Sequence, residues 1–160
     1  MKVIQVPDLE QFKFNGVINI GANTGEYAKC YYDLGISSVV WIDKNANLDG
    51  VLYQATKNFG MRQQYYFTEI NNLDTEKSKR FKSFWRMNAA DIDIETYDLL
   101  HIDVKNNVLN VLSGFENLFT NFRAIILTQH HGNESKNYIE NHGYESVAFS
   151  DIGHTLYVRK

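Results

Sequence analysis

A glycine-containing turn at residues 19–25 is the part of the sequence best suited to bind a small molecule. The stretch Asn-Ile-Gly-Ala-Asn-Thr-Gly follows a short apolar run and precedes a run with helical character. Gly21 and Gly25 carry no Cβ, so a ligand can approach the backbone, and the first amides of a helix that begins at Gly25 would face the same place. A dinucleotide-binding turn has the spacing G-x-G-x-x-G, whereas this one is G-x-x-x-G. The turn therefore predicts a nucleoside cofactor of the adenosyl kind.

A carboxylate follows the next apolar run along the chain. Asp43 lies 22 residues after Gly21, directly after residues 38–42. At the tip of a strand beside the turn, it can accept hydrogen bonds from two vicinal ribose hydroxyls. The alternative is a solvent-exposed aspartate that starts a turn. Asn19 stands where a carboxylate would be expected if the cofactor carries an ammonium group. An amide at this position keeps the hydrogen bonding and loses the charge.

Three histidines and one aspartate complete the set of side chains that could do chemistry. Asp103 ends a predicted strand, with His101 two residues earlier on the same strand face, where a packed strand histidine is the more typical role. His130 and His131 follow the next strand and are the predicted catalytic residues, because a histidine can act as a general base on a hydroxyl at neutral pH. Ordinary solvated loop histidines are the alternative. No spacing specific for a metal site is present, and we predict no metal.

The elements that must position these residues alternate between strand and helix. The apolar run at 38–42 is typical of a strand buried on both faces of a parallel sheet. We predict an α/β fold, a three-layer sandwich on a mostly parallel sheet with an antiparallel terminal hairpin, in which ligands bind at the carboxyl ends of the strands. The predicted strands are 17–20, 38–42, 63–69, 97–104, 124–128, 144–149 and 155–158, preceded by a short β-like piece at 3–6, and the predicted helices are 25–34, 48–59, 108–121 and 136–142.

Composition limits the size and the partners of the protein. Residues 1–160 are enough for one domain, and the net charge of −3 provides no basic field for a nucleic acid or an anionic membrane. The one basic cluster, at 77–82, is interpreted as a solvated helix face. Cys30 is alone, so no internal disulfide can form, and no run of 18 apolar residues occurs. We expect a soluble, cytoplasmic protein.

Several motifs in the same order resemble those of the FkbM family of S-adenosylmethionine-dependent methyltransferases. They are Asn-Ile-Gly-Ala-Asn-Thr-Gly-Glu-Tyr, Val-Val-Trp-Ile-Asp, Tyr-Asp-Leu-Leu-His-Ile-Asp-Val, Val-Leu-Ser-Gly-Phe-Glu-Asn-Leu and Gly-Tyr-Glu, and the likeness covers about residues 16–159. The resemblance implies the class I methyltransferase fold, with a seven-stranded sheet of order 3-2-1-4-5-7-6. It also implies S-adenosylmethionine as cofactor and methyl transfer to a hydroxyl, often on a sugar or another small acceptor.

The resemblance also implies which residues contact the cofactor. The turn would line its methionine part, Asp43 its ribose, Asn71 or its neighbours the adenine, and Asp103 the methionine or acceptor side. The full predicted cofactor set is Asn19, Gly21, Ala22, Asn23, Thr24, Gly25, Tyr27, Asp43, Lys44, Asn71 and Asp103.

Two departures from the family pattern bear on catalysis. Asn19 replaces the usual acid, and Lys105-Asn106-Asn107 stands where Glu-Gly-Ala is usual, so a carboxylate near the reaction centre is missing. The chain is also shorter than its relatives before the first strand, which leaves the acceptor site open or completed by a second copy or another subunit. The alternative to an enzyme is a non-catalytic binding or regulatory subunit with a methyltransferase fold.

Overall fold

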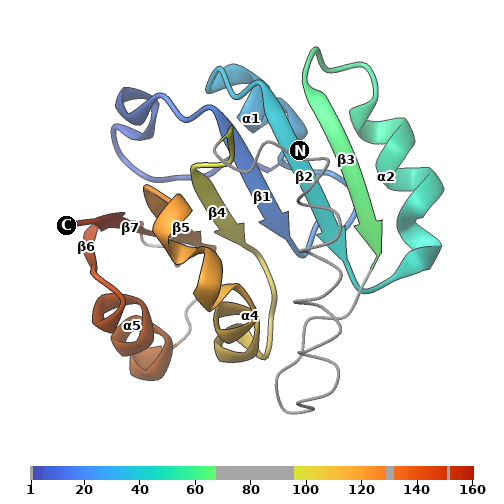
Figure 1. Ribbon diagram of the computed structural model, residues 1–160. Coiled ribbons are helices and arrows are strands. Elements are labelled where there is room, and N and C mark those ends of the chain that lie inside the picture. Colours follow the sequence, from blue (N-terminus) through green and yellow to red (C-terminus); the bar gives the residue numbers. More distant parts are fainter. Residues whose placement is uncertain (1, 68–95, 129–131, 151) are drawn as a thin grey trace.

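The computed structural model describes residues 2–67, 96–128, 132–150 and 152–160, and for residues 116–118 it describes the backbone only. Within these ranges the chain forms one seven-stranded sheet covered by helices on both faces (Figure 1). The strands are β1 (Gly16–Ile20), β2 (Ser38–Asp43), β3 (Arg62–Phe67), β4 (Leu99–Ile102), β5 (Ala124–Leu127), β6 (Tyr144–Phe149) and β7 (Thr155–Arg159). The helices are α1 (Ala28–Asp33), α2 (Asp49–Thr56), α4 (Val108–Phe115) and α5 (Gly132–Asn141), with short 3-10 helices η1 (Leu9–Phe12), η2 (Ala46–Leu48) and η4 (Glu116–Asn121).

The strand order is β3-β2-β1-β4-β5-β7-β6, which confirms the order implied by the family resemblance. The first five strands pair in parallel, and β7 pairs antiparallel with both β5 and β6. The predicted terminal hairpin is therefore confirmed. The arrowheads of β1, β2, β3 and β4 end at one edge of the sheet in Figure 1, and ligands of parallel α/β sheets generally bind at this carboxyl edge.

An apolar layer covers each face of the sheet. On one face Ile18, Leu100 and Ile125 pack with α4 and α5, and on the other face Val17, Leu99 and Ile126 pack with α1, α2 and the segment before β1. The central strands are buried on both faces because alternate residues of each strand enter opposite layers. The apolar run at 38–42 correctly predicted this arrangement for β2.

Several predicted boundaries are wrong. The first helix was expected from Gly25, but α1 begins at Ala28, because the Gly25 amide donates to the Ala22 carbonyl and the Ala28 amide to the Gly25 carbonyl, which closes two turns first. Residues 3–6 form no strand, and α2 ends at Thr56. The helix expected at 108–121 changes to the 3-10 helix η4 after Phe115, and α5 begins four residues earlier than predicted.

Candidate functional site

The carboxyl edge of the sheet brings together the turn after β1, Asp43 and Asp103 from the predicted cofactor set, whereas Asn19 is buried beneath α1. The turn after β1 is tight, since Gly21 and Gly25 both have positive φ, at 84° and 75°, and Asn23 is left-handed at 49°. The amides of Gly21 and Ala22 both donate to the Ile42 carbonyl, at 2.9 and 3.1 Å. The turn is therefore attached to the end of β2.

The two glycines are required by contacts within the protein. A Cβ at Gly21 would lie 2.1 Å from the backbone oxygen of Asp103, and one at Gly25 would lie 2.6 Å from Cγ2 of Thr56 in α2. The space that a Cβ would occupy at each position is therefore filled by the protein itself. The missing Cβ atoms let the turn pack against the end of β4 and against α2.

Asp43 connects the turn to the loop after β2. Its Oδ2 accepts the Asn23 amide at 2.8 Å, and its Oδ1 accepts the Asn45 amide at 2.9 Å. The residue is half-buried, and Lys44 beside it is exposed. A carboxylate offers about four acceptor positions, so Asp43 can hold both loops and still accept hydrogen bonds from a ligand.

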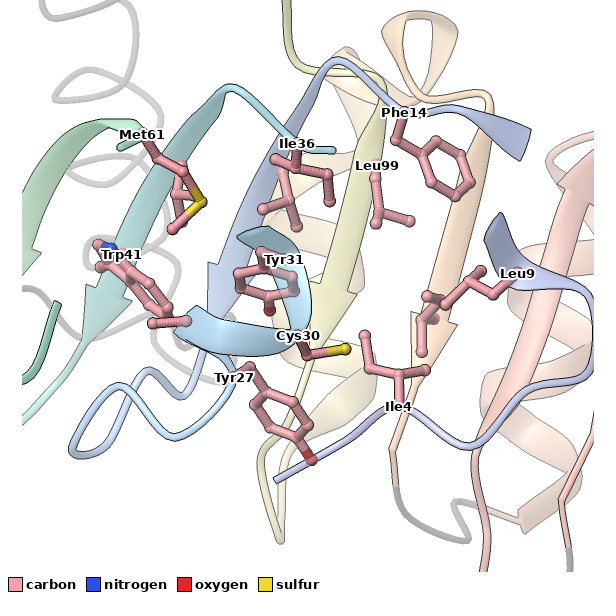
Figure 2. Close-up of a cluster of buried hydrophobic side chains, with 14 of the residues drawn as sticks. Ile4, Leu9, Phe14, Tyr27, Cys30, Tyr31, Ile36, Trp41, Met61 and Leu99 are labelled. Carbon is pink, nitrogen blue, oxygen red and sulfur yellow. The ribbon is translucent and has the colours of Figure 1, made fainter. Parts of the chain in front are cut away.

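Asn19 is placed away from this edge. Its side chain is 1% exposed and lies in the layer beneath α1, where its amide nitrogen is 3.4 Å from Nδ1 of His101 on the neighbouring strand. The hydroxyl of Tyr31 in α1 also bonds to the same Nδ1. Figure 2 shows Tyr31 and Tyr27 in this layer, which Trp41 also lines. Asn19, Tyr31 and His101 thus form a buried polar cluster.

The cluster is electrically neutral. Burial lowers the pKa of His101 to about 3, and it raises the pKa of Tyr31 well above its ordinary value. An amide at position 19 suits a neutral imidazole, whereas a carboxylate there would be a buried charge without a cationic partner. Within the described ranges, two atoms of the cluster have no hydrogen-bond partner, namely Oδ1 of Asn19 and Nε2 of His101.

Asp103 lies at the end of β4, with its side chain 9% exposed. Its amide donates to the Ile20 carbonyl at 2.8 Å, which joins the ends of β4 and β1. Burial, followed by the charge of nearby Asp103, raises the pKa of Tyr27. Thr128 donates to the Ile102 carbonyl from its amide, at 3.2 Å. The Thr128 hydroxyl donates to the same carbonyl at 3.3 Å, so the ends of β4 and β5 are joined by one backbone bond and one side-chain bond.

The sequence prediction missed Lys2 and His154. Lys2 reaches Glu26 and Asp103 from the start of the chain, and His154 accepts the Gln5 amide at 2.8 Å. Neither residue belongs to a motif. Lys2 reaches the site through the packing of segment 2–7, and His154 comes from the connection between β6 and β7. The strand-face argument placed His101 correctly as a packed histidine, while Asn71, His130, His131 and the basic cluster at 77–82 lie outside the described residues.

Metal ligands and membrane spans were also sought. Among the described residues, no group of three His, Cys, Asp or Glu side chains could hold a metal ion. In the same ranges, no helix has both the length and the apolar composition that a membrane crossing needs.

Comparison with known proteins shows the fold. No protein-family model and no curated protein matches this sequence. A protein of Streptococcus pneumoniae in complex with S-adenosyl-L-methionine, provisionally assigned as a tRNA (m1A22) methyltransferase, superposes with a TM-score of 0.64 at 11% identity over 94% of this chain. The fibrillarin pre-rRNA processing protein of Methanococcus jannaschii superposes with a TM-score of 0.65 at 13% identity over 98% of this chain.

An O-methyltransferase family protein of Burkholderia thailandensis gives a TM-score of 0.65 at 8% identity over 96% of this chain. The alignments cover 69%, 71% and 53% of the three proteins in the order named. At these identities the likeness concerns the fold. The chain therefore has the Rossmann-like fold of the class I S-adenosylmethionine-dependent methyltransferases, with its sheet order of 3-2-1-4-5-7-6.

Proposed function

We propose that this protein is an S-adenosylmethionine-dependent methyltransferase of FkbM type that methylates a hydroxyl of a sugar or another small acceptor. The observation that carries the proposal is the position of Asp43. Its half-buried carboxylate stands at the end of β2, 2.8 Å from the amide of Asn23 in the turn after β1. A carboxylate beside the turn supports the proposal, because it can accept hydrogen bonds from the two ribose hydroxyls of an adenosyl cofactor.

The residues at this edge fit an adenosyl cofactor with an amino-acid tail. Asp43 uses two of its acceptor positions for Asn23 and Asn45, so others can receive the two ribose hydroxyls. Among the described residues, the amides of Thr24 and Glu26 donate to no backbone acceptor, which leaves donors for a carboxylate. Asp103 supplies a negative charge for a cationic group of the ligand.

The chemistry needs little from the protein besides position and proton removal. S-adenosylmethionine supplies a methyl group that is already activated on a sulfonium. The chain has to align an acceptor hydroxyl with that methyl group and accept the hydroxyl proton. His130 and His131 remain the predicted bases. In support, Thr128, two positions before His130 in the sequence, lies beside the end of β4 through its bonds to the Ile102 carbonyl.

The net charge of the protein favours a small acceptor over RNA. The two neighbours with RNA-related names do not decide the acceptor, because the likeness to them concerns the fold. RNA binding generally depends on a basic face, whereas this chain has a net charge of −3. We therefore place the acceptor among uncharged hydroxyl compounds such as sugars, with RNA as an outcome that the experiment can detect.

A non-catalytic binding or regulatory subunit is the second candidate. The observation that favours it is the exposed stretch Lys105-Asn106-Asn107 between β4 and α4, where the family resemblance implies a carboxylate. A protein with this change could bind the cofactor and lack turnover.

Methyl transfer from labelled S-adenosylmethionine tests the proposal. The protein is incubated with the small-molecule and RNA fractions of a cell lysate, together with an Asp43→Ala variant and an Asp33→Ala control at an exposed site on α1. We expect label in the small-molecule fraction, lost in Asp43→Ala and kept in the control. Label in RNA would overturn the acceptor class, and cofactor binding without transfer to either fraction would favour the non-catalytic subunit.

A further inference from the structure

Segment 2–7 crosses the layer beside α1, and its first residue, Lys2, lies at the candidate site. Ile4 and Val6 are buried in this layer, and Figure 2 shows Ile4 with Cys30 and Tyr27. The Gln5 amide donates to Nδ1 of His154 at 2.8 Å, and the Lys2 amide donates to the Glu26 carbonyl at 2.9 Å. The segment is therefore anchored along its length, and Lys2 is brought to the turn after β1.

The ammonium group of Lys2 lies between two carboxylates of the site. It is 2.9 Å from Oε2 of Glu26 and 3.7 Å from Oδ2 of Asp103. The hydrogen bond to Glu26 raises the pKa of Lys2, so the side chain is charged at neutral pH. Lys2 is 45% exposed while Asp103 is 9% exposed, so a cation at the surface reaches a carboxylate that is largely withdrawn from solvent.

The position of Asp103 makes this contact relevant to a ligand. Its backbone oxygen lies against Gly21, so the residue belongs to the wall of the turn itself. S-adenosylmethionine carries a sulfonium and an α-ammonium group, and both favour nearby carboxylates. Of the carboxylates described at this edge, Asp43 accepts two amides, and Glu26 and Asp103 both pair with Lys2.

We propose that Lys2 is a built-in competitor for the cationic part of the cofactor and that the structure shows the closed, self-inhibited state. The inference rests on the proposed function. A ligand ammonium that approaches Asp103 and Glu26 must displace the Lys2 ammonium, and segment 2–7 carries that ammonium into place. Because the pair is partly exposed, the competition is modest, about two- to fivefold in the dissociation constant.

Isothermal titration of a Lys2→Gln variant tests this inference. The matched control is Lys29→Gln, which removes the same charge from an exposed pair with Asp33 on α1. Three ligands are compared: S-adenosylmethionine, S-adenosylhomocysteine and 5′-methylthioadenosine, of which the last has the same adenosine but no ammonium group. We expect Lys2→Gln to lower the dissociation constant of the first two about two- to fivefold. The third ligand, and the Lys29→Gln control with all three, should remain at the wild-type values.

Each other outcome overturns the inference. Unchanged or weaker binding of S-adenosylmethionine by Lys2→Gln would show that the lysine does not compete. An equal gain for 5′-methylthioadenosine would show a general opening of the site. If neither the wild type nor the variant binds any of the three ligands, the proposed function fails and the inference fails with it, whereas equal binding by both removes the inference alone.

Discussion

Asn19 on β1 and His101 on β4 face each other across a parallel strand pair, with the amide nitrogen of Asn19 3.4 Å from Nδ1 of His101. Both side chains are uncharged, since burial lowers the pKa of the His101 imidazole and the Asn19 amide carries no charge. The asparagine that replaces the acidic residue implied by the family resemblance is therefore compatible with the neutral His101 beside it. This substitution affects the packing of the layer beneath α1 as well as any contact with a cofactor.

The neutral histidine makes stability depend on pH. The pKa of His101 is about 3 in the folded protein, against an ordinary value of 6.5. Between these values the unfolded chain binds a proton that the folded chain does not. The contribution is therefore full above about pH 6.5 and is lost as the pH falls toward 3, by at most about 1.4 kcal/mol per pH unit.

A His101→Gln variant removes this contribution. Urea unfolding at several pH values between about 4.5 and 7.5 should show the stability difference between wild type and variant shrinking as the pH falls. A difference that stays constant over this range would show that His101 does not titrate as the structure requires.

The hydroxyl of Tyr31 stabilises the same cluster. Tyr31→Phe removes the hydroxyl that bonds to Nδ1 of His101 and leaves the buried imidazole with one partner fewer, which should cost about 1–3 kcal/mol in the free energy of unfolding. Tyr32→Phe is the control, because the neighbouring tyrosine is 51% exposed. Equal effects of the two substitutions in urea unfolding would contradict a structural role for the Tyr31 hydroxyl.

The stability cost of close packing at Gly21 can be separated from the cost of backbone strain by comparison with Gly35. Gly21 and Gly35 have similar positive φ values, 84° and 76°, but a Cβ at Gly21 meets the Asp103 backbone oxygen at 2.1 Å while one at Gly35 meets nothing within 4 Å. Gly35→Ala should therefore cost about 1–2 kcal/mol, from conformation alone. Gly21→Ala should cost at least about 3 kcal/mol, since backbone must move as well. Thermal unfolding measures both, and comparable losses would be inconsistent with the contact.

The sheet could be predicted from the sequence because its central strands are nearly continuous apolar runs. The run at 38–42 and the run at 124–128 each lie within one residue of the observed strand ends. Helix starts were harder to predict, since the turns closed by Gly25 and Ala28 use local backbone bonds that no side-chain pattern reports.

The polar contacts of the site were beyond a single sequence for a different reason. Asn19 and His101 are separated by 82 positions, and their pairing depends on the register between β1 and β4. The ion pairs of Lys2 depend on how segment 2–7 packs beside α1. Asp43, by contrast, could be found because it ends an apolar run at a set distance from the glycine turn.

Titration of S-adenosylmethionine into the wild-type protein and into Asp43→Ala tests the central claim most directly. Since hydrogen bonds to a charged group contribute about 1.5–3 kcal/mol, Asp43→Ala should weaken binding by about tenfold or more, while Asp33→Ala should bind as the wild type does. Thermal unfolding of each variant controls for loosening of the loops that Asp43 holds. We predict saturable binding at one site per chain in the wild type. Absence of binding at millimolar cofactor, or full affinity in Asp43→Ala, would contradict the account.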